Sequence, residues 1–434
     1  MKRSGFIALV CIFLAAMILT VGCKKSETTA GAAAGTSASR APVEITVMHS
    51  KIETDSALKA YAALYERQTG VKVNVRSVGG DTSLDSVVRS MLAAGDEPEI
   101  IAIEGRAGYE EHLAGGRITD LSDQAWARDT DVAYIDASGR TVGFPMAIEG
   151  WGLGYNKSIL DRAGINPATL INVNAIRAAF ERLDSMKAQL GIDAVVSMAA
   201  SADMSWVPGN HGTNTYLALG LPYNNSRRYI DMMLSGQVDN TRLTAFAEYM
   251  NLLFRYSNRT TLLAGGYDQQ VGEFVIGKTV FVHQGNWIDP NMAEFGATFE
   301  VGYIPHAMLT ENTDGIFVGA PWYYIVNSKS RNVEEAKKFL NAMATTRDGH
   351  DYMVTQAGMI PAFKSVTLTP SGGFSKAVQA YANQGKIYAW QQNDMPSGFG
   401  GDTLGPIYNQ LASGSINVAR FVELFRNAVA TLAR

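Results

Sequence analysis

The sequence predicts an α/β protein built from more than one folding unit. From residue 43 onward, short β-branched segments alternate with amphipathic helical segments, which is typical of parallel sheets covered by helices. The alternation restarts after the stretch 143–146. With 434 residues, the chain is longer than one hydrophobic core usually supports, so two or three domains are expected.

The first unit has the order strand, helix, strand, helix, strand. Residues 43–48 alternate between apolar and polar side chains, and 71–75 and 99–103 are short apolar runs, which predicts three strands. Helices are predicted over 55–68 and 84–92, because their apolar residues recur every three or four positions. This order implies a parallel sheet with helices on both faces.

Polar residues follow each of these strands. The strand ends are the tripeptides His49-Ser50-Lys51, Gly79-Gly80-Asp81 and Glu104-Gly105-Arg106. Ligands of open α/β sheets bind at the carboxyl ends of the strands. We therefore name His49, Asp81, Glu104 and Arg106 as candidate ligand contacts.

The remainder of the chain continues the mixed pattern. The expected elements are helices over 176–190 and 240–257, a strand over 278–283, a strand over 316–326 interrupted by Gly319 and Pro321, and helices over 333–343 and 416–434.

Composition and motifs exclude several function classes. The formal net charge of -4 argues against a broad surface for nucleic acid. Two cysteines exclude a disulfide scaffold. The sequence has no GxSxG motif and no HExxH motif, and its six histidines show no i,i+4 pair. We therefore predict no catalytic residue, no cofactor and no metal site.

The N-terminus looks like a targeting segment. Two basic residues precede the apolar run 6–21, which is shorter than a membrane-spanning helix requires. Residues 19–23 (LTVGC) resemble a bacterial lipobox, so we expect a signal peptide over 1–22 and a lipid on Cys23. Residues 23–42 are small and polar, which indicates a flexible tether. The protein is then expected outside the cytoplasm, anchored to a bacterial membrane in the periplasm or at the cell surface.

The tryptophans indicate a carbohydrate ligand. Several of the six lie beside Gly, Asn or Pro in expected loops instead of in helical stripes. An aromatic face can cover the apolar face of a sugar ring, while nearby amides and carboxylates bond its hydroxyls. The candidates are Trp151, Trp287 with its neighbour Asn286, Trp322 and Trp390.

Four segments resemble a known family. The stretch GFPMAIEGWGLGYNK at 143–157 resembles the hinge-crossing segment of extracellular solute-binding proteins, family 1, which serve sugar ABC importers. Residues 98–121, 271–287 and 317–340 resemble three further segments of that family in the same order. The maltose-type proteins are similar examples.

This resemblance implies a two-lobed periplasmic-binding-protein fold, type II-like, with the ligand cleft between the lobes. Lobe one would comprise 43–147 and 305–355, and lobe two would comprise 151–302 and 356–434.

The resemblance also implies site residues. Glu149 falls where maltose-type proteins place a hinge carboxylate, and Trp287 falls on their stacking tryptophan. Glu104 and Arg106 fall near strand-end contacts, although their residue types differ, which puts maltose itself in doubt. The loop containing His211 falls near another contact region.

Two function classes follow. In the first, a lipid-anchored binding protein captures a mono- or oligosaccharide and delivers it to an ABC import permease by hinge closure. In the second, a secreted carbohydrate-active enzyme uses Glu149 with another carboxylate. A non-sugar solute such as a polyamine is a further alternative. Iron is disfavoured, because the adjacent Tyr323 and Tyr324 would point to opposite faces of a strand.

Overall fold

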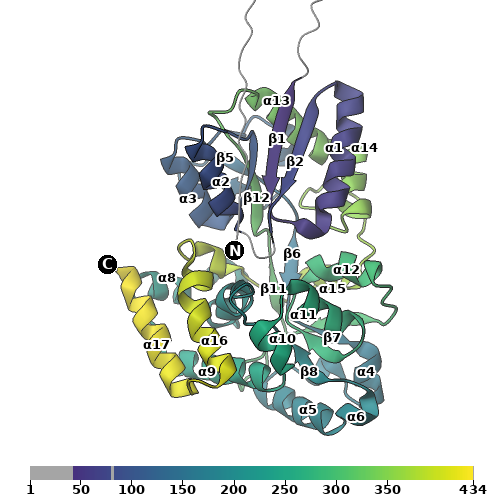
Figure 1. The fold of residues 1–434 in the computed structure, drawn as a ribbon, viewed down its shortest axis with the longest axis vertical. Coiled ribbons are helices and arrows are strands. Elements are labelled where there is room, and N and C mark those ends of the chain that lie inside the picture. Colours follow the sequence, from purple (N-terminus) through teal and green to yellow (C-terminus); the bar gives the residue numbers. More distant parts are fainter. Residues whose placement is uncertain (1–42, 80–82, 434) are drawn as a thin grey trace, which may run out of the picture. The chain divides into compact units, whose positions relative to one another are not determined.

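The computed structural model describes residues 43–79 and 83–433. The predicted signal peptide, the tether with Cys23, and the candidate contact Asp81 lie outside these residues. Figure 1 shows the arrangement of the helices and strands.

One half of the molecule, called the first half below, contains a six-stranded mixed sheet built from 44–145 and from a later strand at 322–326. Its strands run in the order β2 (Lys72–Ser77), β1 (Glu44–His49), β3 (Ile100–Glu104), β12 (Trp322–Val326), β5 (Thr141–Pro145) and β4 (Tyr134–Ile135). Strand β1 pairs in parallel with both β2 and β3, which confirms the predicted order. Strand β12 inserts antiparallel between β3 and β5, although it lies far away in the sequence.

Helices cover this sheet. They are α1 (Asp55–Thr69), α2 (Leu84–Ala93), α3 (Gly105–Ala114), α13 (Val333–Thr345) and α14 (Arg347–His350). Helix α1 places Leu58, Tyr61 and Tyr65 on one buried face, as its periodicity predicts. The ring centroid of Tyr61 lies 5.5 Å from that of Phe339 on α13, so two helices that are far apart in the sequence share one core.

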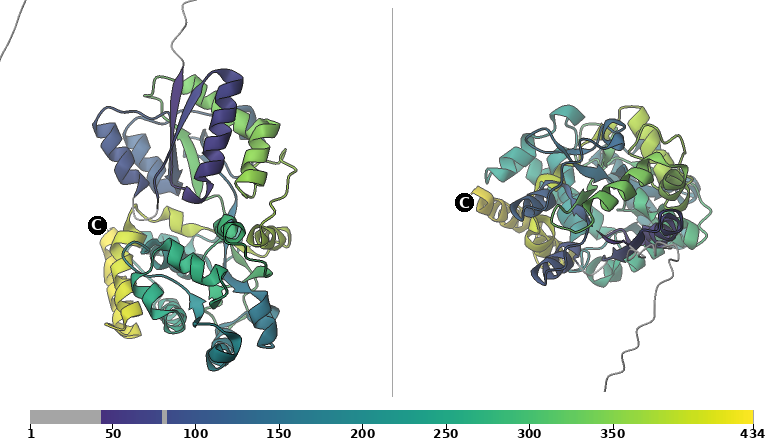
Figure 2. Two further views of the ribbon diagram at one scale, coloured as in Figure 1. Left: turned by 45° about the vertical axis from the view of Figure 1, so that its right-hand side comes forward. Right: turned by 90° about the horizontal axis from the view of Figure 1, so that it is seen from above.

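The second half of the molecule contains two smaller sheets. The four-stranded sheet has the order β10 (Val301–Ile304), β7 (Leu153–Asn156), β9 (Thr279–Val282) and β8 (Ala194–Ser197). The three-stranded sheet has the order β13 (Ile387–Tyr388), β11 (Ile316–Gly319) and β6 (Glu149–Trp151). Figure 2 shows these sheets and their helices below the six-stranded sheet.

Many helices surround the smaller sheets. They are α4 (Lys157–Arg162), α5 (Val173–Ser185), α6 (Lys187–Leu190), α7 (Thr213–Ala218), α8 (Arg228–Leu234), α9 (Asn240–Arg255), α10 (Arg259–Ala264), α11 (Tyr267–Val275), α12 (Asp289–Glu294), α15 (Gly373–Asn383), α16 (Gly405–Ser413) and α17 (Val418–Ala430). The helix expected over 176–190 is divided at Met186 into α5 and α6. The helix expected over 416–434 is shorter in the structure, because α17 covers Val418–Ala430.

The strand expected over 316–326 is in fact two strands in two sheets. Strand β11 ends at Gly319 and pairs with β6, whereas β12 begins at Trp322 and joins the six-stranded sheet. Pro321, between them, has no N–H for a ladder bond, so it suits a crossing between sheets.

The buried apolar side chains also divide between the two halves. One cluster surrounds the six-stranded sheet, and two others surround the smaller sheets. Ala307, Met308 and Phe317, which lie in the range expected for lobe one, are buried in the second half. We therefore propose 319–322, instead of 305, as the place where the chain returns to lobe one; a second crossing runs from β5 to β6.

Candidate ligand-binding site

A cleft lies where the two halves face each other, and it encloses about 1180 Å³ when the open solvent at its mouth is included. The first half contributes the strand ends and the helices that follow them. These residues are Ser50, Lys51, Ile52, Glu53, Val78, Gly79, Ser83, Leu84, Asp85, Glu104 and Trp322. The crossing strand β6 and the second half contribute Glu149, Met204, Trp206, Asn210, His211, Tyr267 and Trp287.

The strand-end rule therefore locates the cleft correctly. Lys51 comes shortly after β1, Gly79 comes after β2, and Glu104 is the last residue of β3. Parallel neighbours end at the same edge of the sheet, which brings these residues together. Trp322 is the cross-strand partner of Glu104, so the antiparallel strand β12 delivers an aromatic side chain to the same edge.

Lys51 forms an ion pair at the centre of this site. Its ammonium lies 2.5 Å from Oε1 of Glu149 and 3.8 Å from Oε1 of Glu53. The exposed fraction of the side chain is 13% for Lys51 and 9% for each carboxylate. Burial alone lowers the pKa of Lys51, but the charges of Glu149 and Glu53 outweigh burial and raise that pKa above its usual value.

The same ammonium contacts two aromatic faces. It lies 5.5 Å from the ring centroid of Trp287 and 5.7 Å from that of Trp322. These distances are typical of cation–π interactions. Lys51 was not among the candidate contacts predicted from the sequence, although it lies in the tripeptide His49-Ser50-Lys51 at the end of β1. Its position just after a strand was the signal that could have identified it.

Two further carboxyl groups face the cleft. Burial raises the pKa of Glu104 to about 7, the charge of Asp85 acts in the same direction, and Lys51 opposes both. Burial also raises the pKa of Asp85, with Glu111 adding to the shift and Arg89 opposing it. Among the residues that the structure describes, neither Glu104 nor Asp85 has an ion-pair partner.

An aromatic and histidine cluster lies beneath the cleft in the second half. Trp151 is fully buried and stacks on Phe317, with ring centroids 4.4 Å apart. Its ring also lies 5.1 Å from that of His211, 5.2 Å from that of His283 and 5.1 Å from that of His306. Burial lowers the pKa of all three histidines, so we expect neutral imidazoles there near pH 7.

Glu149, Trp287, Glu104, His211 and Trp322 are the candidate residues that the structure brings together at the cleft.

Two aromatic candidates have a supporting position. Trp151 is inaccessible, so we do not retain it as a ligand contact. Trp390 packs behind the cleft, with its ring centroid 6.3 Å from that of Trp287 and 5.6 Å from that of His211. We therefore expect Trp151 and Trp390 to support the lining residues instead of touching a ligand.

Three polar candidates also lie outside the cleft lining just described. His49 is fully buried 3.7 Å from Asp55, and burial lowers its pKa to about 4 despite that carboxylate. Arg106 is not among the lining residues and pairs with Glu110 at 2.6 Å. The buried Asn286 accepts a hydrogen bond from the backbone N–H of Gly150 at 2.8 Å, so it fixes the strand that carries Glu149.

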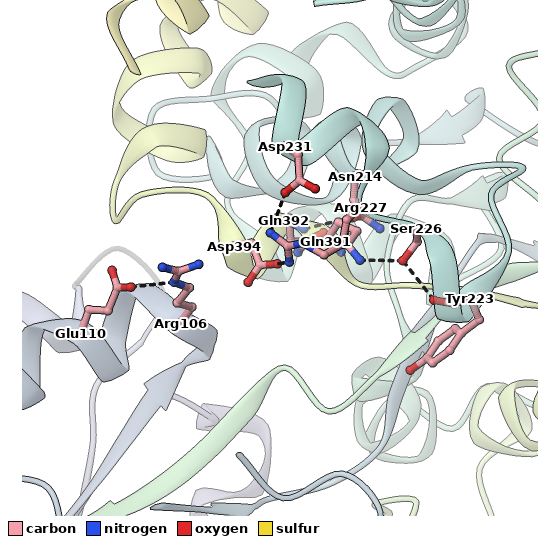
Figure 3. A network of polar contacts seen from close by, with 10 residues as sticks. All are labelled: Arg106, Glu110, Asn214, Tyr223, Ser226, Arg227, Asp231, Gln391, Gln392 and Asp394. Carbon is pink, nitrogen blue, oxygen red and sulfur yellow. Dashed lines mark hydrogen bonds and ion pairs between the residues drawn. The ribbon is translucent and has the colours of Figure 1, made fainter. Parts of the chain in front are cut away.

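Figure 3 shows a polar network whose residues are not part of the cleft lining. Arg227 pairs with Asp394 at 2.5 Å and with Asp231 at 2.9 Å. The side-chain oxygen of Asn214 accepts hydrogen bonds from the backbone N–H groups of Gln391 and Gln392. These bonds fix the turn η8 (Gln391–Asp394), which follows Trp390.

No three His, Cys, Asp or Glu side chains among residues 43–79 and 83–433 gather closely enough to hold a metal ion. Within the same residues, no helix is both long and apolar enough to cross a membrane.

Known sequences match this chain over most of its length. The family profile described as bacterial extracellular solute-binding protein matches residues 49–349. The melibiose/raffinose/stachyose-binding protein MelE of Bacillus subtilis is 24% identical over 361 residues, which cover 81% of this chain and 79% of MelE. The multiple sugar-binding protein of Streptococcus mutans is 23% identical over 369 residues, which cover 81% of this chain and 80% of that protein.

Solved structures share the fold. A sugar transporter protein from Bacillus licheniformis in complex with stachyose has a TM-score of 0.72 at 20% identity, covering 90% of this chain and 100% of that one. The solute-binding protein RafE in complex with raffinose has a TM-score of 0.75 at 17% identity, again covering 90% and 100%. The predicted two-lobed α/β fold with a cleft is confirmed.

Proposed function

The chain belongs to the bacterial extracellular solute-binding proteins, and from that premise we propose that it binds an oligosaccharide in its cleft and delivers it to an ABC importer. Relatives named for melibiose, raffinose, stachyose and multiple sugars support this function. The family consists of binding proteins, which favours this function over the two alternatives, a carbohydrate-active enzyme and a polyamine-binding protein.

One observation carries the proposal. The cleft combines four aromatic side chains with carboxylates, the groups that contact the faces and the hydroxyls of sugar rings. Trp206, Tyr267, Trp287 and Trp322 offer aromatic faces to the apolar faces of sugar rings. Glu149 is held in place by Lys51 and can accept hydrogen bonds from sugar hydroxyls.

A thermal-shift screen tests the proposal. A ligand that binds only the folded protein raises the melting temperature by mass action. The panel should contain melibiose, raffinose, stachyose, maltose and chitin oligosaccharides, with spermidine as the non-sugar arm. A rise with at least one saccharide, reproduced by calorimetry, is the expected result. A rise with spermidine alone would overturn the proposal.

We also propose that the protein binds its ligand without transforming it. Glu149 is ion-paired with Lys51, an arrangement that suits a fixed acceptor. Overnight incubation of the bound saccharide with a stoichiometric amount of protein should return it unchanged by chromatography. Time-dependent cleavage that the Glu149→Gln variant abolishes would support the enzyme alternative.

Membrane anchoring and the importer belong to the same proposal. A lipid on Cys23 and the tether over 23–42 would hold the lobes near a permease outside the cytoplasm. The Cys23→Ser variant should move from the membrane fraction to the soluble fraction when it is expressed in a bacterial host. Mass spectrometry of membrane-derived protein with an unmodified Cys23 would contradict the anchoring.

A further inference from the structure

The cleft carries more acidic than basic side chains. Four carboxyl groups from four separate elements line it, on Glu53, Asp85, Glu104 and Glu149. Lys51 is the one lysine or arginine among the described lining residues. A cleft lined mainly by one sign of charge concentrates ligands of the opposite sign.

Lys51 balances only part of this charge. Its ammonium is within ion-pair distance of Glu149 and Glu53, at 2.5 Å and 3.8 Å. Asp85 and Glu104 face the same space and have no ion-pair partner among the described residues. Burial and the nearby charge of Asp85 make ionisation of Glu104 costly and raise its pKa. A cation between them would remove that cost.

The site already holds one primary ammonium, which belongs to the chain itself. Lys51 is surrounded by the carboxylates described above and by the faces of Trp287 and Trp322, at 5.5 Å and 5.7 Å from the two ring centroids. Carboxylates together with aromatic faces are the groups that recognise an ammonium. The contacts of Lys51 therefore indicate that this lining can stabilise the ammonium group of a ligand.

An unsatisfied polar atom also lies at the cleft. His211 lines it with an exposed fraction of 7%, and its Nδ1 has no hydrogen-bond partner among the described residues. Burial lowers the pKa of His211, so the neutral ring can offer one nitrogen as an acceptor. This nitrogen is itself buried, so it belongs to the packing behind the cleft lining and does not distinguish a hydroxyl from an ammonium.

Resting on the proposed function, we infer that the cleft selects a saccharide with a free, positively charged amino group, which Asp85 and Glu104 bind. The aromatic side chains contact the sugar ring, and Lys51 stays with Glu149 and Glu53. An uncharged sugar of the same shape lacks the ion pair with Asp85 and Glu104, and an acidic sugar is repelled by both.

Three disaccharides of one shape test the inference by titration calorimetry. They are the β-1,4-linked glucosamine disaccharide, its fully N-acetylated form, and cellobiose, which has hydroxyls at the same positions. The glucosamine disaccharide should bind about tenfold to a hundredfold more tightly than cellobiose, because charge-assisted contacts have that effect. Spermidine is the fourth ligand. It carries ammonium groups but no sugar ring, so it measures binding of the charge alone.

Two variants and one control locate the effect. The Glu104→Gln and Asp85→Asn variants should each reduce the preference for the glucosamine disaccharide over cellobiose by about tenfold. Neither substitution changes the volume of the side chain appreciably, and circular dichroism verifies the fold. The control Glu181→Gln, on the exposed side of α5, should leave the preference unchanged.

The outcomes separate the inference from the proposed function. If cellobiose, the N-acetylated disaccharide or another uncharged oligosaccharide binds as tightly as or more tightly than the glucosamine disaccharide, the inference is wrong and the proposed function stands. An unchanged preference in both carboxyl variants also overturns it. If spermidine binds and no saccharide does, both are wrong.

Discussion

The ammonium of Lys51, just after β1, lies 2.5 Å from Glu149 on β6, and so one ion pair joins the six-stranded sheet to the three-stranded sheet. Both side chains are largely removed from water, with exposed fractions of 13% and 9%. The two residues pair where the chain crosses between the lobes, and both also line the cleft. Changes to it should therefore affect stability as well as binding.

Breaking this pair should destabilise the protein more than removing both partners. We expect Lys51→Met and Glu149→Gln each to lower the free energy of unfolding by about 3 kcal/mol, because each disrupts a largely buried ion pair. The double variant should lose less than the sum, and urea denaturation of all four proteins measures the coupling. The exposed pair Lys157–Asp161 is the control, with an expected coupling of about 0.5 kcal/mol. Additive losses at Lys51 and Glu149 would contradict this prediction.

Trp287 should contribute to binding through its aromatic face. Its Nε1 donates a hydrogen bond to Gln284 at 2.8 Å, which fixes the ring beside the cleft. Trp287→Ala should weaken binding of the identified saccharide by about tenfold to a hundredfold, whereas Trp287→Phe should retain most of the affinity. Calorimetry measures both, and Phe295→Ala, an exposed aromatic outside the cleft lining, is the control. Wild-type affinity in a folded Trp287→Ala variant would exclude stacking on this ring.

Glu104 should make stability fall as the pH rises. Burial, assisted by Asp85 and opposed by Lys51, raises the pKa of Glu104 from 4.5 to about 7. The folded state thus binds the proton more tightly than the unfolded chain, so this stability is present below about pH 4.5 and is lost as the pH rises through 7. The free energy of unfolding of Glu104→Gln, minus that of wild type, should increase by about 2 kcal/mol between pH 5 and 8.

Urea titrations at several pH values measure this difference. The control Glu181→Gln, on an exposed part of α5, should differ from wild type by a constant amount over the same range. A constant difference for Glu104→Gln as well would mean that its carboxyl titrates normally.

Gly105 should not tolerate a side chain. Its φ is +53°, and a Cβ added there would lie 2.5 Å from the Cβ of Asn393 in η8. Gly105→Ala should therefore lower the free energy of unfolding by about 1–3 kcal/mol. The matched control is Gly272→Ala in α11, where nothing lies within 4 Å of the added methyl and a gain of about 0.5–1 kcal/mol is expected. Equal effects at the two positions would show that the close contact with η8 has no energetic consequence.

Ligand binding should close the cleft by hinge bending. The chain crosses between the halves at 145–149, at 319–322 and again at 366–374, and the backbone N–H of Ile148 donates to the carbonyl of Ile360 at 2.9 Å beside the first crossing. Few strands join the two halves, so rotation there can bury the ligand. Small-angle scattering should give a smaller radius of gyration with saturating saccharide than without. A sugar that does not bind is the control, and identical profiles would indicate a rigid pocket.

The sequence by itself determined the local elements and the edge where the cleft lies. Alternating and 3.6-residue patterns reflect which face of each segment is buried, and they located β1, β2, β3, α1 and α2 closely. The rule for parallel strands then indicated the strand ends, because neighbouring strands end at a common edge. The family resemblance added Glu149 and Trp287, which lie at the cleft.

Tertiary structure alone decided which residue of each strand end faces the cleft. His49 and Lys51 are two positions apart, yet the chain leaves β1 so that His49 is buried by Asp55 and Lys51 reaches Glu149. Trp151 is covered by Phe317 and the buried histidines, partners that come from distant segments. A local pattern carries no information about such long-range contacts. The insertion of β12 beside β3, and with it the position of Trp322 opposite Glu104, depends on the same packing.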